Sequence, residues 1–417
     1  MRSPLAGLSD PRRVGLVSVA HGLNEFYAIV LPPLFPLLVA DLSISYAQAG
    51  TLLTVFFLMY AAFQLPAGLL ADRVGKFRLV LAGIVVLGGG VLLMALAPDY
   101  RTLLAAQVVA GIGGSTYHPA GMSLISDLET GETEGRAMGF HGAVGTAGVA
   151  LSPALLGGLT LVVDWRTALA VAGGVGLAAA LVLRLAYDPP ERTTEDAADL
   201  DAGAVTGTIR ERLRSALRVP VTDQLLVLLL LHAFVSMLTR AVQTFTTSFV
   251  FAGGTGTLTG GNAAFVALLV GSGTASLWFG GLADRMNRHR LGVAVSLVTA
   301  ALLGSTLFLP ASVPLVALLP WFFVIGVATY SVTPVKNAIA SAYSERGFSG
   351  GAFGLLQSAS AVGSAVAPAL FGFLADRWGV VAAYPAIGAV CALIAVCFLV
   401  LAVRGEPTPL PGFAGEV

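Results

Sequence analysis

The chain is 417 residues long, 56% hydrophobic and only 11% charged, with a mean hydropathy of +0.85. About a quarter of the residues of a soluble globular domain are charged, so this composition excludes that class and predicts a membrane protein. The 23 basic and 23 acidic residues cancel, and no nucleic-acid partner is expected. Both cysteines fall in the last apolar run, so the sequence predicts neither a disulfide framework nor a metal site.

Apolar runs recur along the whole chain. A helix needs about 20 apolar residues to cross the hydrocarbon core, and backbone groups in lipid must be paired within the segment. The sequence therefore predicts an all-α polytopic membrane protein with twelve transmembrane helices. The predicted spans are 14–40, 47–71, 79–97, 102–125, 137–163, 167–187, 223–251, 261–283, 291–309, 315–343, 350–374 and 380–403.

One long polar segment, 188–221, separates the sixth span from the seventh. Its first half is acidic and has the composition of a disordered linker, and 208–219 has the spacing of an amphipathic helix on an anionic membrane surface. We therefore expect a six-helix bundle in 1–187, a cytoplasmic linker in 188–221 and a second six-helix bundle in 222–417.

Lysine and arginine lie mainly in alternate loops. With the amino terminus inside the cell, eighteen basic residues fall in cytoplasmic segments and only Arg101, Arg166 and Arg377 on the opposite face. The bias towards basic cytoplasmic loops predicts a multi-pass protein of the cell membrane with both termini cytoplasmic. The first apolar run has no convincing small-residue cleavage site, so it is expected to be a membrane helix rather than a removed signal peptide.

The two halves of the chain resemble each other. Residues 68–78 read GLLADRVGKFR and residues 280–290 read GGLADRMNRHR, each at the end of an apolar run. His21 pairs with His232 and Tyr117 with Tyr330 at offsets of 211 and 213 residues. Such ordered matches indicate two six-helix bundles in parallel repeat, with a substrate site near the midplane between them.

The first of these loops resembles the signature of the major facilitator superfamily between its second and third helices. The matching residues are Gly68, Asp72, Arg73, Gly75, Lys76 and Arg78. The resemblance implies a cytoplasmic gate in which Asp72 and Arg73 latch helix ends, and we extend this role to Asp284 and Arg285 of the repeat. A third copy, at 372–377, is predicted on the outer face, and we attribute it to chance and helix-end chemistry.

Finer features are similar to the fosmidomycin-resistance branch of efflux proteins in that superfamily. They are His21-Gly-Leu-Asn24-Glu25 in the first span, Tyr117-His118-Pro119 in the fourth and Gly139-Phe-His141 entering the fifth. The resemblance implies transport of a small molecule and covers much of the amino-terminal half.

Three charged residues, Glu25, Arg240 and Lys336, lie deep in predicted spans. A charge at the bilayer centre costs about 2.5 to 3.5 kcal/mol on insertion scales, so each is a candidate functional residue. Glu25 lies one helical turn from His21 and is the candidate proton-coupling site, together with His21 and His118. The alternative for Glu25 is a packing role, through hydrogen bonds to Asn24, His118 or Lys336.

Other polar residues within the spans are candidates for a substrate cavity, because polar groups in lipid are costly. Structural roles between helices are the alternative for the histidines, and extension of the side chain to the nearest interface is the alternative for Arg240 and Lys336. The candidates are Asn24, Tyr117, His141, His232, Arg240, Gln243, Tyr330, Lys336 and Asn337.

These observations predict a monomeric secondary transporter that exchanges protons for a small, anionic or amphiphilic solute by alternating access. An importer of an organic anion, and a receptor on the same fold, are the alternatives. No nucleophile-base pair, phosphate loop or ATP-binding sequence occurs in the 417 residues, so neither an enzyme nor a cofactor is expected.

Overall fold

A computed structural model describes residues 5–188, 222–309, 313–344 and 350–404, and the regular elements there are helical. The predicted surface helix at 208–219 lies outside the described residues. In the first half of the chain the helices are α1 (Pro11–Ala28), α2 (Phe35–Asp41), α3 (Tyr46–Val74), α4 (Lys76–Ala95), α5 (Tyr100–Ser115), α6 (Ser123–Leu128), α7 (Glu132–Leu159) and α8 (Trp165–Ala186).

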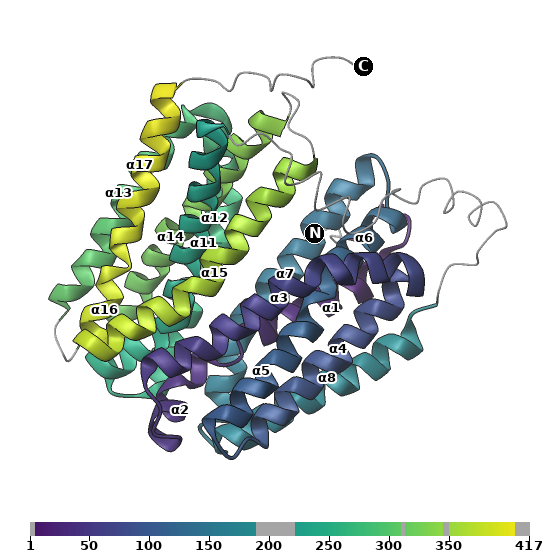
Figure 1. Cartoon of the computed structure of the whole chain (residues 1–417), viewed down its shortest axis with the longest axis horizontal. Coiled ribbons are helices and arrows are strands. Elements are labelled where there is room, and N and C mark those ends of the chain that lie inside the picture. Colours follow the sequence, from purple (N-terminus) through teal and green to yellow (C-terminus); the bar gives the residue numbers. More distant parts are fainter. Residues whose placement is uncertain (1–4, 189–221, 310–312, 345–349, 405–417) are drawn as a thin grey trace. The chain divides into compact units, whose positions relative to one another are not determined.

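In the second half the helices are α11 (Asp223–Val250), α12 (Leu258–Arg285), α13 (Arg288–Ser305), α14 (Leu315–Ser344), α15 (Gly350–Trp378), α16 (Val380–Ala386) and α17 (Gly388–Arg404). In this half α12 packs along α14, α11 along α15, and α13 along α17 (Figure 1). Eleven segments of the described chain are long and apolar enough to cross a membrane. The prediction of an all-α polytopic membrane protein is confirmed.

The predicted fourth span, 102–125, is not one continuous α-helix. It consists of α5, a π-helical turn η2 (His118–Met122) and the short helix α6, so none of its pieces reaches spanning length by itself. Pro119 at the start of η2 has no backbone N–H to continue the α-helical ladder. The extra residue of a π-turn changes the direction in which the neighbouring side chains point.

Prolines also divide the predicted first and last spans. The first consists of α1, a 3-10 turn η1 (Pro32–Leu34) and α2. The last consists of α16, which contains Pro385, and α17. By contrast, Pro153 and Pro368 lie inside the continuous helices α7 and α15.

The chain forms two compact units that differ from the two halves of the sequence. Unit 1 contains the described residues within 1–28, 59–149 and 166–217, and unit 2 those within 29–58, 150–165 and 218–417. Helices α3 and α7 therefore contribute to both. In unit 1, α4 packs along α5, and Tyr117, Ile84 and Leu183 belong to one buried core cluster.

Glycines bring certain helices into backbone contact. In unit 1, a Cβ added to Gly148 on α7 would overlap the carbonyl oxygen of Gly22 on α1. In unit 2, a Cβ added to Gly363 on α15 would overlap the carbonyl oxygen of Ala233 on α11. Small residues that permit such approach are typical of helix pairs in membranes.

The carboxyl end of α15 is bonded to the amino end of α3 within unit 2. The Asp376 carboxylate accepts hydrogen bonds from the backbone N–H groups of Tyr46 (2.7 Å) and Ala47 (3.0 Å). Thr54 on α3 donates to the carbonyl of Ala365 at 2.6 Å. Asp376 belongs to the third G-x-x-A-D-R copy. The helix-end chemistry predicted there is present, but it caps another helix.

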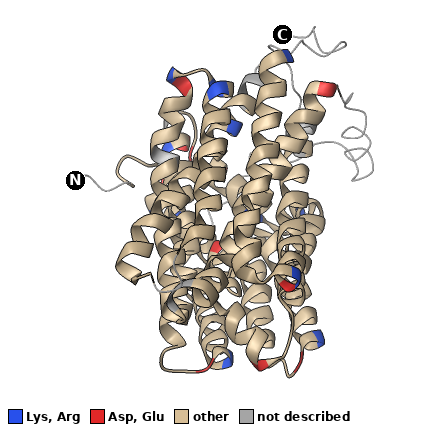
Figure 2. Cartoon of the chain, turned by 90° about the vertical axis from the view of Figure 1, so that its left-hand side faces the viewer, with Lys and Arg blue, Asp and Glu red and all other residues tan. Residues whose placement is uncertain are grey.

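Charged residues gather towards the helix ends, with few along the helices (Figure 2). This distribution agrees with the cost of charge in lipid. The few charged residues that lie along the helices are therefore candidates for function.

Candidate functional site

The first candidate site starts on α1, where His21 and Glu25 are one helical turn apart and share a face. His21 Nε2 lies 3.7 Å from Glu25 Oε1. The candidate membrane-spanning segment that contains them in the structure runs from Pro11 to Asp41, 31 residues, so Glu25 lies near its middle. The carboxylate is therefore far from either end of the span.

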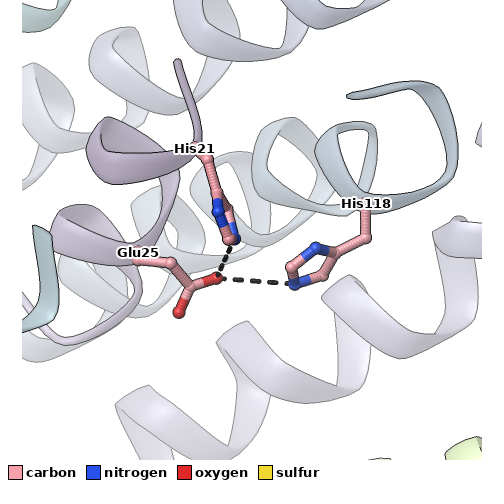
Figure 3. Close-up of side chains that lie close together, drawn as sticks. All are labelled: His21, Glu25 and His118. Carbon is pink, nitrogen blue, oxygen red and sulfur yellow. Dashed lines mark ion pairs between the residues drawn. The ribbon is translucent and has the colours of Figure 1, made fainter. Parts of the chain in front are cut away.

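His118 joins this pair from the π-turn η2. Its Nε2 lies 3.4 Å from Glu25 Oε1 (Figure 3). The two imidazole rings meet edge to face, with centroids 5.4 Å apart at 70°. We call His21, Glu25 and His118 the His–Glu cluster. The structure thus brings together the three residues that the sequence analysis selected for proton coupling.

Two further rings fix His21 in place. His21 stacks on His141 from α7, with centroids 4.2 Å apart, and on Tyr117 at 5.1 Å. Its Nδ1 is 3.0 Å from the carbonyl oxygen of His141. Tyr117 donates its hydroxyl to the Val17 carbonyl at 2.6 Å and is buried. Tyr117 thus supports the cluster with its ring, while its hydroxyl is used to join two helices.

Asn24 and Tyr60 surround the carboxylate from the other side. Asn24 Nδ2 donates to Tyr60 Oη at 3.1 Å and approaches Glu25 Oε1 at 3.5 Å. The Tyr60 ring meets the His118 ring edge to face, 5.9 Å between centroids. The sequence analysis selected Asn24 and missed Tyr60. The sequence signal for Tyr60 was a tyrosine inside the next predicted span, 47–71.

A second polar group lies in unit 2. Arg240 Nη1 on α11 donates to Gln243 Oε1 at 2.8 Å, and Gln243 Nε2 donates to Tyr330 Oη on α14. We call Arg240, Gln243 and Tyr330 the arginine cluster. The guanidinium carbon of Arg240 is 3.9 Å from the ring centroid of Phe57, a cation-π distance. Arg240 is half-buried.

The remaining predicted cavity residues of unit 2 have separate surroundings. His232 is buried, with Nδ1 2.9 Å from the Leu228 carbonyl of its own helix. Lys336 is also buried, at 7% exposure. Asn337 is exposed. Lys336 therefore belongs to the interior of unit 2.

The predicted gate loop is very short. Helix α3 ends at Val74 and α4 begins at Lys76, so Gly75 alone joins them, with φ of 95°. A side chain is strained at such φ, which explains the glycine. Lys76 pairs with Asp127 at 2.5 Å.

The other gate residues of unit 1 have no such partner in the described chain. Asp72, Arg73 and Arg78 are exposed, and Asp72 and Arg73 form no ion pair among the described residues. Gly68 lies on α3 near Pro119. Asp127, which pairs with Lys76, was missed because it is 51 residues away.

The repeated gate loop is anchored differently. Asp284 pairs with Arg288 at 3.7 Å, and Arg288 also donates to the carbonyl of Ala338 at 3.0 Å. Arg285 is exposed. Asp284 lies at the end of α12 and Arg288 at the start of α13, so this pair joins the two sides of the loop.

Glu129, in the loop after α6, binds the segment before α1. Its carboxylate accepts hydrogen bonds from the backbone N–H of Ser9 (3.0 Å) and Asp10 (2.8 Å). Burial acts to raise the pKa of Glu129, but the hydrogen bonds from Asp10, Ser9 and Thr133 outweigh it and lower this pKa from its ordinary value. Glu129 therefore holds residues 9–10 through its charged form.

The described chain has helices of spanning length, charged residues inside them and two similar gate loops. These features define a polytopic α-helical membrane protein with ionisable groups in its spans. Comparison with known proteins gives the family. The sequence profile of the Major Facilitator Superfamily matches residues 16–261 and 233–416. The chain belongs to the Major Facilitator Superfamily.

Several characterised relatives are similar over part of the chain. The Probable L-galactonate transporter of Escherichia coli K12 is 32% identical over 40% of this chain and 37% of its own length. The Puromycin resistance protein pur8 of Streptomyces alboniger is 35% identical over 46% and 39%. The Quinolone resistance protein NorA of Staphylococcus aureus is 25% identical over 42% and 45%. These alignments span less than half of each relative.

The fold is also similar to that of a solved structure. A bacterial homologue of the human lysosomal transporter Spinster, in its inward-facing and occupied conformation, has a TM-score of 0.78 at 16% identity, over 96% of this chain and 99% of that one. The same homologue in its unoccupied conformation has a TM-score of 0.71. The prediction of the major facilitator fold is confirmed.

Proposed function

We propose that this protein is a proton-coupled secondary active transporter that exports a small, anionic or amphiphilic solute by alternating access of two six-helix halves. The observation that carries the proposal is the His–Glu cluster, a carboxylate near the middle of a span with an imidazole 3.4 Å away and another 3.7 Å away. Three groups that each take and release a proton form a short relay. A chemical conversion of the solute is not part of the proposal.

The proton is a suitable coupling ion for this cluster. A charged Glu25 attracts protonated His21 or His118, whereas a neutral Glu25 does not, so uptake of one proton changes the forces within α1 and between α1 and the π-turn η2. A conformational change driven by an ion requires such a difference in interaction between two states. Moving one charge through 100 mV supplies about 2.3 kcal/mol.

The arginine cluster supports an anionic or hydrogen-bonding solute. A guanidinium binds carboxylates and phosphonates with two parallel hydrogen bonds, and Gln243 holds Arg240 at 2.8 Å on one side. The drug-resistance names of two relatives support efflux. The resemblance of 21–25, 117–119 and 139–141 to the fosmidomycin-resistance branch is part of this proposal.

We further propose that both termini face the cytoplasm and that the gate loops lie on that side. The eighteen-to-three distribution of basic residues supports this orientation. In this arrangement Lys76 and Asp127 hold the end of α4, while Asp72 and Arg73 are available to a partner helix. The protein acts as a monomer in the cell membrane.

The test is transport in proteoliposomes with an imposed pH gradient. Glu25→Gln keeps the size of the side chain but has no charge to titrate, so pH-driven export is expected to stop while substrate still binds. Glu134→Gln, at the start of α7 and outside the cluster, is the matched control and should transport normally. Full pH-driven flux in Glu25→Gln would overturn the proposal.

The second candidate is import of an organic anion, by symport or exchange. The name of the Escherichia coli relative, a Probable L-galactonate transporter, and the cation in the arginine cluster favour it. Vesicles loaded with carboxylates or phosphonates on one side separate the two candidates by the direction of net flux and by whether protons accompany it. A thermal-shift screen with the same compounds identifies the solute class, because a ligand of the folded state raises apparent stability.

A further inference from the structure

The His–Glu cluster has the composition of a transition-metal site. One ligand atom from each of His21, Glu25 and His118 can be chosen so that all lie within 4.8 Å of one another. Imidazole nitrogens suit zinc and its neighbours in the first transition row, whereas calcium and magnesium prefer oxygen ligands. The sequence analysis expected no metal site because it searched for short spacings, and His118 follows Glu25 by 93 residues.

The two distances from the Glu25 carboxylate agree with a tetrahedral ion. Zinc binds imidazole nitrogen at about 2.0–2.1 Å and carboxylate oxygen at about 2.0–2.2 Å, so neighbouring ligand atoms of a tetrahedral site are roughly 3.4 Å apart. Glu25 Oε1 lies 3.4 Å from His118 Nε2 and 3.7 Å from His21 Nε2. Both distances are longer than a normal hydrogen bond and close to the separation of two ligands.

The hydrogen bond of His21 explains why a cation fits there. Its Nδ1 faces the carbonyl oxygen of His141 at 3.0 Å. A carbonyl oxygen only accepts, so Nδ1 carries the proton. In the neutral ring, Nε2 then presents a lone pair to the Glu25 carboxylate, and two acceptors face each other. A bond from the second ring nitrogen to a backbone carbonyl is the usual support of a histidine that binds metal.

The stacked ring of His141 holds the His21 ring in place. His141 is 3% exposed, and both of its ring nitrogens are buried without a hydrogen-bond partner among the described residues. Its ring lies 4.2 Å from that of His21 and nearly parallel, at 10°. This stacking supports the orientation in which His21 Nε2 faces the Glu25 carboxylate.

The cluster is also accessible. The side chains of His21, Glu25 and His118 are 12%, 25% and 35% exposed. A metal site needs an entry path as well as ligands, and three protein ligands leave a fourth position open for water or a solute group.

We propose that His21, Glu25 and His118 bind one zinc ion, and that the bound ion blocks transport by occupying the coupling carboxylate. The second part rests on the proposed function, while the binding itself does not. Zinc thereby acts as an inhibitor from whichever side the cluster is open.

Binding is tested on the purified full-length protein with zinc and a competing chromophoric chelator. Wild type should bind one zinc ion per chain at this site, and His118→Ala and Glu25→Gln should each weaken binding by at least about tenfold. His232→Ala is the matched control, because His232 is a buried histidine bonded within its own helix. Cobalt in place of zinc should give the absorption of a tetrahedral ion in wild type and in His232→Ala, but not in His118→Ala or Glu25→Gln.

The outcomes are separable. Thermal unfolding without metal checks that each variant is folded, and the cobalt spectrum of wild type needs no variant. Absence of saturable zinc binding by wild type, full zinc affinity in His118→Ala, or an equal loss in His232→Ala would overturn the site. If zinc binds but does not slow pH-driven flux, the inhibitory role is wrong. Active flux that is lost in Glu25→Gln would support proton coupling even if zinc did not bind.

Discussion

His21 on α1 and His232 on α11 are equivalent positions of the two halves, 211 residues apart, but their surroundings differ. His21 bonds to a carbonyl on α7 and stacks on His141, whereas His232 bonds to Leu228 of its own helix. Offsets of 211, 213 and 215 residues place Ser236 opposite Glu25, Ser331 opposite His118 and Leu356 opposite His141. The ionisable cluster therefore exists in one half only.

Helix packing, by contrast, is retained in both halves. Gly148 and Gly363 are 215 residues apart, and each permits backbone contact with the first helix of its half. Close packing leaves no tolerance for a larger residue, while polar side chains at the same depth are free to change. The comparison indicates that the repeat preserves the helix contacts, whereas the residues of the His–Glu cluster are found in the first half.

The largest expected effect tests the shared part of this comparison. Gly148→Ala and Gly363→Ala each place a Cβ against backbone that cannot rotate away, so both should lose stability by about 1–3 kcal/mol or more. Thermal unfolding of the purified variants measures the loss. Gly142→Ala and Gly273→Ala, where a Cβ meets nothing within 4 Å, are the controls. An unchanged Tm in Gly148→Ala or Gly363→Ala would contradict the conclusion that both halves retain this close helix packing.

The next effect tests the second half. Arg240→Gln removes the guanidinium of the arginine cluster. It should weaken the binding of an anionic solute by roughly ten- to hundredfold, since hydrogen bonds to charged groups contribute about 1.5–3 kcal/mol. The dependence of flux on the pH gradient should stay as in wild type. Equilibrium binding and KM provide the measurement, and Arg377→Gln on the exposed end of α15 is the control. If the pH dependence of flux changes while the affinity for the solute does not, the arginine cluster would be assigned to proton coupling and not to solute binding.

A smaller effect tests the asymmetry of the histidines. His21→Asn should slow pH-driven flux by about tenfold, equivalent to ~1.4 kcal/mol in the barrier, whereas His232→Asn should leave it nearly unchanged. Initial rates in proteoliposomes compare the two directly. Equal losses would show that the asymmetry seen in the structure has no functional meaning.

Gly145→Ala approaches the same question without removing the histidine. Its Cβ would overlap the His21 ring, which can turn aside, so the protein should fold and yet transport as poorly as His21→Asn. Normal flux would mean that the position of the His21 ring is unimportant.

The smallest effect concerns Glu129, which holds the segment before α1. Because the pKa of Glu129 is lowered in the folded state, its contribution to stability is present above its unfolded pKa and lost as pH falls through the folded one. Glu129→Gln should therefore lower Tm by a few degrees at most at neutral pH and have no effect in acid. Glu134→Gln is the control, and a difference that persists in acid would contradict this explanation.

The sequence predicted the fold well because spans and gate loops are local features. Length and hydropathy set the helices, and the spacing of four residues placed His21 beside Glu25. The breaks at Pro32, Pro119 and Pro385 were not predicted, since Pro153 and Pro368 stand in similar apolar runs without breaking them. Tertiary packing decides which prolines interrupt a helix.

The site was predicted only in part, for the same reason. Glu25, His21 and His118 were selected as polar residues in lipid, but the meeting of His118 with Glu25 depends on the π-turn. Tyr60 and Asp127 were missed because their partners lie on other helices. The sequence analysis assigned Tyr117 to a substrate cavity. The bond from its hydroxyl to the Val17 carbonyl joins residues 100 apart in the chain, and such a contact cannot be read from the sequence.

The contact between α3 and α15 has one further consequence. Gly50 and Gly372 let the two backbones touch, and the Asp376 carboxylate accepts from the backbone N–H groups of Tyr46 and Ala47 at one end of the contact. A larger side chain at either glycine would push the backbones apart and lengthen these hydrogen bonds. The position of the Asp376 carboxylate therefore depends on two glycines that carry no polar group themselves.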